Sequence, residues 1–110
     1  MTEKQIKKAI ELAEGFECKI ELDREIVEYK NRYYTLKDLY KWEYYPLLLY
    51  RAVEKFNENH VDLGINIYDD CVLYFGHDDE TYYYYKKNYI STPYLTAQEA
   101  ALEAALKEVL

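Results

Sequence analysis

Few residues in this chain could act as a nucleophile or as a base. It has a single serine, Ser91, two histidines, His60 and His77, and two cysteines, Cys18 and Cys71. A hydrolytic triad needs a nucleophile, a base and an orienting acid held together, and Ser91 lies in no nucleophile motif such as G-x-S-x-G. The three glycines are isolated, so there is no Gly-rich phosphate-binding loop. We therefore expect a protein that is not an enzyme and that uses no cofactor.

Two short acidic segments are the other places where chemistry could occur. Asp69 and Asp70 are consecutive, and Asp78, Asp79 and Glu80 follow a histidine. Hard cations such as Ca²⁺ require several convergent oxygen ligands, and no EF-hand spacing is present. The two segments are expected in turns at opposite ends of one short strand. We expect no metal site, and we interpret both segments as solvated turns that can face a partner.

The distribution of charge favours such a partner-binding role. The net charge is −7, from 21 acidic and 14 basic residues. Between residues 56 and 85 there is no lysine or arginine, and the acidic residues of that window are Glu58, Asp62, Asp69, Asp70, Asp78, Asp79 and Glu80. A surface of this sign repels nucleic acid backbones and anionic membranes. We expect no direct binding to nucleic acid or membrane, and a basic protein as the partner.

The 15 tyrosines are the most unusual feature of the composition. They cluster at residues 33–34, 44–45 and 82–85. Tyrosine brings a large, rigid contact area with a polar tip, and it is enriched in protein interfaces. Two interpretations stay open: the rings fill a sheet that is covered on both faces, or some of them form a recognition surface. For the second, Tyr82 and Tyr84 share one face of a strand and join the acidic turns as candidate partner-binding residues.

Hydrophobic spacing predicts the helices that would position these residues. We predict helices over residues 3–14, 46–57 and 97–110, with a short helix over 36–43 leading into the second of them. Thr2 with Gln5, and Thr96 with Glu99, form capping boxes at two of the starts. Pro46 fits the first turn of the longest helix, where its missing N–H has no cost.

Alternating segments predict strands over residues 16–22, 25–30, 63–68, 71–75 and 81–89. The links between neighbouring strands have hairpin length, which indicates antiparallel pairing. The predicted fold is a single α+β domain over residues 1–110. It has an antiparallel sheet of about five strands packed with three helices, in the order α-β-β-α-β-β-β-α.

Neither a targeting segment nor a membrane span is predicted. The longest apolar stretch, residues 44–50, is far too short to cross a bilayer. Cys18 and Cys71 give neither a metal-ligand spacing nor a disulfide framework, and we interpret both as small apolar residues in strands. These features favour the cytoplasm.

Three segments resemble a known group of proteins. Residues 45–57, which read YPLLLYRAVEKFN, residues 5–13, which read QIKKAIELA, and the ending AQEAALEAALKEVL are similar to short uncharacterised phage and mobile-element proteins of gut Bacteroidota. More loosely, the layout resembles the phage α-β-α sandwich domain. The resemblance implies a phage or mobile-element origin and a bacterial host cytoplasm, and it brings no catalytic residues.

Three functional hypotheses follow. The preferred one is a small acidic accessory protein that binds a basic protein, including a nucleic-acid-binding protein whose groove it occupies by mimicking phosphate charge. A phage origin makes an inhibitor of host defence one version of this hypothesis. The alternatives are a self-associating structural protein, in which tyrosines pair between copies to give a homo-oligomer, and a small-ligand-binding protein whose pocket is lined by tyrosines.

Overall fold

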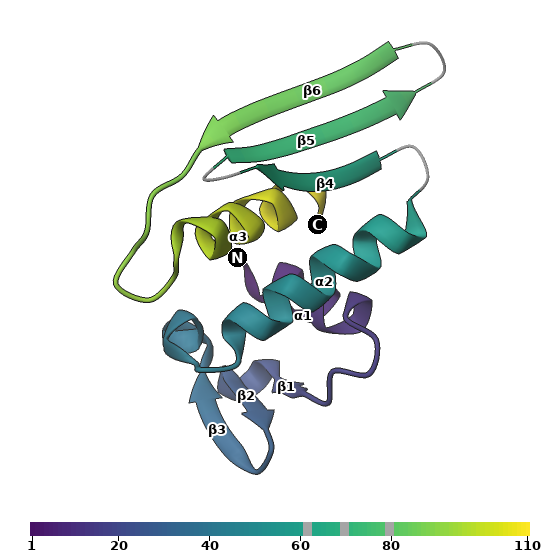
Figure 1. Cartoon of the computed structure of the whole chain (residues 1–110). Coiled ribbons are helices and arrows are strands. Elements are labelled where there is room, and N and C mark those ends of the chain that lie inside the picture. The colour runs from purple at the N-terminus through teal and green to yellow at the C-terminus, as the bar shows by residue number, and fades with distance from the viewer. Residues whose placement is uncertain (61–62, 69–70, 79–80) are drawn as a thin grey trace.

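The structure is a computed structural model that describes residues 1–60, 63–68, 71–78 and 81–110; for most of the strand residues from 63 to 88 it describes the backbone alone. The elements are α1 (Glu3–Leu12), β1 (Lys19–Glu21), η1 (Leu22–Arg24), β2 (Ile26–Tyr29), β3 (Arg32–Thr35), η2 (Leu36–Lys41), α2 (Tyr45–Asn59), β4 (Leu63–Tyr68), β5 (Cys71–Asp78), β6 (Thr81–Asn88) and α3 (Ala97–Val109), with η denoting 3-10 helices. The prediction of an α+β fold is confirmed. Figure 1 shows α1, α2 and α3 lying between two groups of strands.

Side-chain caps fix where two of the helices begin. At α1, the Thr2 hydroxyl accepts a hydrogen bond from the Gln5 backbone N–H at 3.2 Å, and the Gln5 side chain accepts one from the Thr2 N–H at 3.0 Å. Thr96 and Glu99 repeat this capping box at α3, at 3.2 and 3.3 Å. These hydrogen bonds confirm both predicted caps. Each cap satisfies backbone donors that the first helical turn leaves without partners.

Helix α2 forms the centre of the molecule. Pro46 lies in its first turn, as predicted, and the helix runs two residues beyond the predicted end. The residues that α2 buries recur at steps of three and four: Tyr45, Leu48, Leu49, Ala52, Val53 and Phe56. One stripe of this kind is what a helix needs to pack against a core.

The first sheet is an antiparallel meander of β1, β2 and β3. Its second hairpin turns at Lys30 and Asn31, which have φ of 49° and 64°, as the tight turns of hairpins require. The connection between β1 and β2 is the short helix η1, where the sequence predicted a tight turn. Thr35 ends β3 and caps η2, because its hydroxyl accepts from the Asp38 N–H at 3.2 Å.

The second sheet joins β4, β5 and β6, also antiparallel, with Tyr68 opposite Cys71 and Asp78 opposite Thr81. The prediction of one sheet of about five strands is therefore wrong: the strands form two separate sheets of three. Helix α2 gives the physical reason. Its 15 residues carry the chain roughly 22 Å between β3 and β4, so that the second sheet packs on the other side of the helices.

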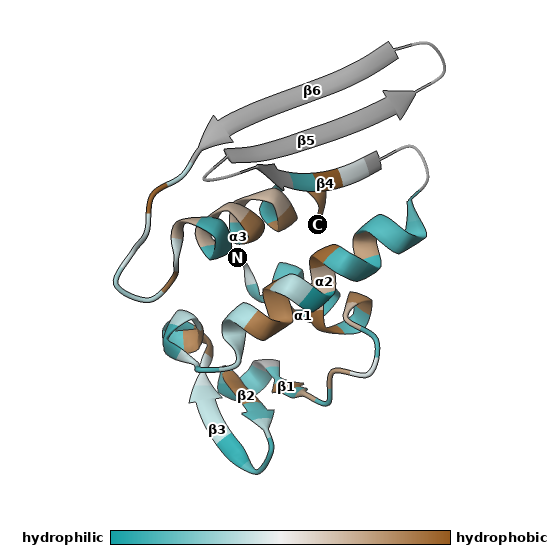
Figure 2. Cartoon of the chain, in the orientation of Figure 1, coloured by the Kyte–Doolittle hydropathy of each residue, from teal (hydrophilic) through white to brown (hydrophobic). Residues whose placement is uncertain are grey.

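The core lies where the three helices face one another and the sheets. Figure 2 shows apolar residues on the inner sides of the helices and in the middle of β4. Val27 of β2 is fully buried on one side, while Ile65 of β4 is 3% exposed on the other. Ala9, Ala52 and Ala101 have no exposed surface, and side chains this small let helices approach closely.

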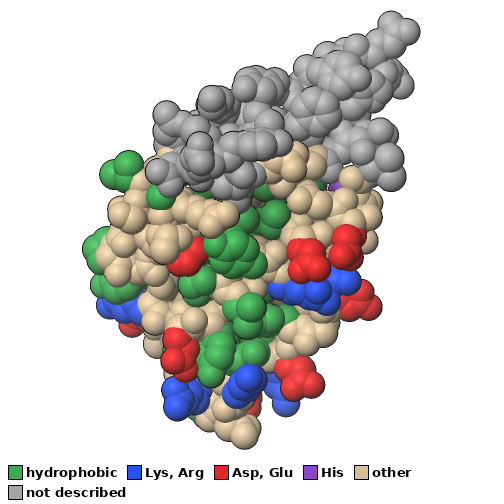
Figure 3. All heavy atoms as spheres, viewed as in Figure 1, with side chains coloured by type: hydrophobic (Ala, Val, Ile, Leu, Met, Phe, Trp, Pro, Cys, Tyr) green, Lys and Arg blue, Asp and Glu red, His purple; other side chains and the backbone are tan. Residues whose placement is uncertain are grey.

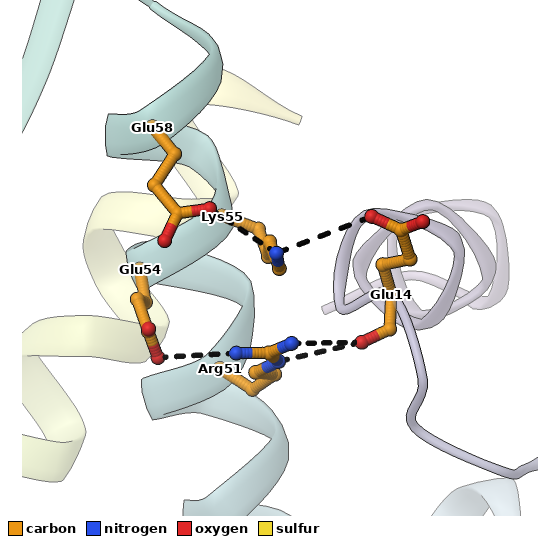
Figure 4. A network of polar contacts seen from close by, with 5 residues as sticks. All are labelled: Glu14, Arg51, Glu54, Lys55 and Glu58. Atoms are coloured by element: carbon orange, nitrogen blue, oxygen red, sulfur yellow. Dashed lines mark hydrogen bonds and ion pairs between the residues drawn. The ribbon is translucent and has the colours of Figure 1, made fainter.

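Polar contacts fasten the end of α1 to α2 (Figure 4). Arg51 donates to the backbone carbonyl of Glu14 from Nη2 at 3.1 Å and from Nε at 3.4 Å. Lys55 pairs with Glu58 at 3.1 Å and reaches Glu14 at 4.0 Å. Glu14 follows the C-cap residue of α1, so Arg51 ties the segment that leaves α1 to the neighbouring helix.

None of the described helices combines the length and the apolar character needed to cross a bilayer.

Candidate functional site

The structure describes the predicted partner-binding residues only in part. Asp69, Asp70, Asp79 and Glu80 lie outside the described residues. Asp78 is placed as the last residue of β5, and Tyr82 and Tyr84 are placed on β6, by their backbone.

The strand register nevertheless decides one question about these residues. Tyr82 is opposite His77 and Tyr84 is opposite Phe75, so both tyrosines are paired residues within a hairpin. The backbone of β5 extends from Cys71 to Asp78, which separates its two ends by roughly 23 Å. The two ends of β5 therefore lie far apart.

Exposed tyrosines are found elsewhere in the described part of the chain. Tyr29 and Tyr45 are buried, but four other rings have substantial exposed surface: Tyr33 at 65%, Tyr94 at 49%, Tyr50 at 43% and Tyr40 at 41%. Some tyrosines are therefore part of the core and others lie on the surface, and a recognition surface formed by exposed rings stays a prediction.

Several ion pairs join acidic and basic side chains on the described surface. Glu58, one of the seven acidic residues of the base-free window, forms an ion pair with Lys55. Other pairs join Arg24 to Glu21 and Arg32 to Glu43, each at 3.1 Å. Figure 3 shows acidic and basic side chains lying next to one another on this face rather than in separate patches. An unbalanced acidic surface, if present, must come from the rest of the window.

A cavity of about 380 Å³ is the best-formed candidate for a binding site among the described residues. Its walls are apolar and come from distant parts of the chain: Ile6 of α1, Leu36 and Leu39 of η2, and Leu95, which precedes α3. This volume and this lining are typical of small-ligand pockets. Sequence reasoning missed the cavity because its walls come from segments that lie far apart in the chain.

Two exposed aromatic rings border the cavity. Tyr40 and Tyr94 meet edge to face, with ring centroids 4.9 Å apart. The turn at Thr92 sets the position of Tyr94, because its hydroxyl accepts from the N–H groups of Tyr94 at 3.3 Å and Leu95 at 3.0 Å. Lys41 Nζ lies 5.8 and 5.7 Å from the Tyr40 and Tyr94 centroids, which is within the range of cation–π attraction.

A polar edge completes the cavity. The Tyr45 hydroxyl donates to Oε2 of Glu103, and Lys107 Nζ lies 3.4 Å from Oε1 of the same carboxylate. Burial first, and then the hydrogen bond to Glu103, raise the pKa of Tyr45, so this phenol keeps its proton. Burial, and then the charge of Lys107, lower the pKa of the Met1 amino group, which also lines the cavity. The polar edge therefore consists of the Glu103 carboxylate, the Lys107 ammonium group and the Met1 amino group.

A separate aromatic cluster lies against the first sheet and has a structural role. Trp42 is 1% exposed and meets Tyr29 and Tyr34 at centroid distances of 5.3 and 5.4 Å. Phe16 stacks on Tyr29 at 4.9 Å, and Tyr44 lies 4.6 Å from Tyr29. Tyr29 and Trp42 are buried, and Phe16, Tyr34 and Tyr44 are partly buried around them. Ring contacts of this kind stabilise the fold.

The residues considered for nucleophilic or metal chemistry have other contacts. His60 stacks on Phe56 at 4.0 Å, and its Nδ1 lies 2.8 Å from the Phe56 carbonyl. Burial, and then the charge of Glu28, raise the pKa of Cys18 to about 11, which leaves little thiolate at neutral pH. No group of three potential metal ligands occurs among the described residues. The side chains of Cys71 and His77 are outside the description.

Comparison with known proteins adds no assignment, because no family model, no curated protein and no solved structure matches this chain.

Proposed function

We propose that this chain is a small acidic accessory module that binds a basic protein in the bacterial cytoplasm. The observation that carries the proposal is the base-free window of residues 56–85, which holds seven acidic residues in a chain of net charge −7. Steering by an unbalanced surface of this kind raises association rates with partners of opposite charge. The proposal assigns no catalytic activity and no cofactor.

Exposed tyrosines support the same proposal. Tyr33 on β3 and Tyr50 on α2 lie on the surface of the described part, and Tyr82 and Tyr84 are the candidates on β6. Aromatic rings supply the contact energy that charge steering alone does not give. The resemblance to phage and mobile-element proteins favours a host protein as the partner, and a nucleic-acid-binding host defence protein fits the acidic surface.

Capture from a host lysate tests this function at two salt concentrations. The tagged chain is expected to retain a basic protein at low ionic strength and to release it at high ionic strength, since screening weakens attraction between exposed charges. Replacement of Tyr82 and Tyr84 by serine should reduce capture, whereas replacement of Lys4 and Lys7 on α1 by glutamine should not. Equal capture of the partner at both salt concentrations would contradict the proposal. Equal capture by the tyrosine variant and the lysine variant would contradict it as well.

Self-association is a second candidate, favoured by the strand order. In the second sheet, β6 is the last strand, so one of its edges has no strand beside it among the described residues. Such an edge pairs readily with a second copy. Light scattering at high protein concentration decides between the two, because a monomer at all concentrations excludes the homo-oligomer.

A further inference from the structure

We propose that the cavity beside Tyr40 and Tyr94 binds a small, neutral, planar aromatic molecule that carries a hydrogen-bond donor next to an acceptor on one edge. Primary aromatic amides and heteroaromatic rings of the lactam or aminopyridine kind belong to this class. The site does not depend on the proposed partner protein, since it is built from described residues outside the base-free window.

The walls select the body of the ligand. Leu36, Leu39 and Leu95 are apolar, and the Tyr40 and Tyr94 rings meet at an interplanar angle of 62° beside them. A planar aromatic group is favoured between such surfaces, because it combines apolar burial with edge-to-face or stacked ring contacts. A volume of about 380 Å³ is near the lower end of the range for ligand pockets, so the ligand is a single ring or a fused pair.

The polar edge selects the functional groups. A carboxylate has about four acceptor positions, and Glu103 uses them for the Tyr45 hydroxyl and for Lys107. Glu103 can therefore accept further hydrogen bonds. The Lys107 ammonium group has three N–H donors, so it can still donate to a ligand. A ligand edge with a donor toward Glu103 and an acceptor toward Lys107 satisfies both at once.

Charge balance selects a neutral ligand. The Glu103 side chain is 20% exposed, and it already has an opposite charge beside it in Lys107. A cationic ligand would meet the Lys107 ammonium and the Met1 amino group, and an anionic ligand would meet the Glu103 carboxylate. Either would add an unbalanced charge to a partly buried ion pair, which is unfavourable.

Four probes that share one ring test this inference: benzamide, benzoate, benzylamine and toluene. Titration is followed by backbone amide shifts of Tyr40, Leu95 and Glu103 in the ¹⁵N-labelled protein. Benzamide is expected to bind in the millimolar range, as a ligand of this size allows. The other three probes should bind at least about fivefold more weakly than benzamide, because each lacks the donor, the acceptor or both.

Two pairs of variants locate the site. Tyr94→Leu removes a wall and Lys107→Met removes the donor at the polar edge; each should weaken benzamide binding about fivefold. The matched controls Tyr33→Leu and Lys4→Met change exposed residues that do not line the cavity, and they should leave binding within about twofold. Circular dichroism and thermal melting check that all four variants fold.

Several results would overturn the inference. Equal or tighter binding of benzylamine or benzoate would show that the site selects charge. Equal binding of toluene would show that the polar edge contributes nothing. The cavity is not a site for this ligand class if the two control variants abolish the amide shifts as strongly as Tyr94→Leu does. The same conclusion follows if no probe shifts any of the three amides.

Discussion

The side chain of Asn57 pairs with both backbone polar groups of Ile65. Its Nδ2 donates to the Ile65 carbonyl at 2.9 Å, and its Oδ1 accepts from the Ile65 N–H at 2.7 Å. Asn57 lies in the last turns of α2 and Ile65 is the buried residue of β4, so one amide group substitutes for a neighbouring strand. This contact joins the helices to the second sheet, and hence to the strands that carry the predicted partner-binding residues.

Asn57→Ala should destabilise the protein by about 2 kcal/mol, because it removes two hydrogen bonds and leaves a backbone donor and acceptor of a part-buried strand without partners. Asn59→Ala, which changes an exposed residue of the same helix, should cost less than about 0.5 kcal/mol. Urea unfolding measures both. Equal midpoints for the two variants would mean that the Asn57 contact does not hold β4 to α2.

Arg51→Met should also destabilise the protein, by about 1 kcal/mol, because it removes the two hydrogen bonds to the Glu14 carbonyl. Glu54→Gln removes only the exposed ion partner of Arg51, which lies at 3.5 Å, and should cost less than about 0.5 kcal/mol. If the two substitutions have the same effect in urea unfolding, the hydrogen bonds from Arg51 to the Glu14 carbonyl do not stabilise the protein.

Two glycines should respond differently to alanine. Gly15 has a φ of +83° with open space around it, so Gly15→Ala should cost about 1 kcal/mol through backbone strain alone. At Gly64 a Cβ would make ordinary contacts, the nearest being 3.6 Å from Asn66 Nδ2. Gly64→Ala should therefore be neutral or slightly stabilising. Thermal unfolding compares them, and a larger loss at Gly64 than at Gly15 would refute this expectation.

Stability should fall in alkaline solution in a way that depends on Cys18. Its pKa rises from 9.0 to about 11 in the folded state, through burial and then Glu28. Because the folded thiol holds its proton while the unfolded thiol loses it, the associated stability is complete below pH 9 and is lost as the pH rises toward 11. Tyr45, whose pKa is also raised, adds to the loss above pH 10.

Cys18→Ala tests this pH dependence. Urea unfolding at neutral pH and at pH near 11 should show a smaller loss of stability for the variant than for the parent. Parallel losses in the two proteins would assign the alkaline sensitivity to other groups.

The helices were predictable because their signals are local. The capping boxes at Thr2 and Thr96, Pro46 in the first turn of α2, and the buried stripe of α2 each depend on residues within a few positions of one another. The division of the strands into two sheets was not predictable in this way. It depends on the direction in which α2 carries the chain, and alternation along a strand does not state which strand lies beside it.

The cavity could not be predicted for a related reason. Tyr45 and Glu103 are 58 positions apart, and Tyr40 and Tyr94 meet across a similar separation. Neither Tyr45 nor Glu103 lies in a sequence motif, and only the packing of the helices brings their side chains together.

The central claim, that the acidic turns bind a basic partner, is tested most directly by two variants of equal charge. One replaces Asp69, Asp70, Asp78, Asp79 and Glu80 by the corresponding amides. The other does the same to Glu3, Glu11, Glu17, Asp23 and Glu108, which are exposed elsewhere. The dissociation constant of the captured partner is measured for both at one salt concentration. The turn variant should bind at least about tenfold more weakly, with the second variant within about twofold of the parent. Equal weakening of both, or of neither, would contradict the account.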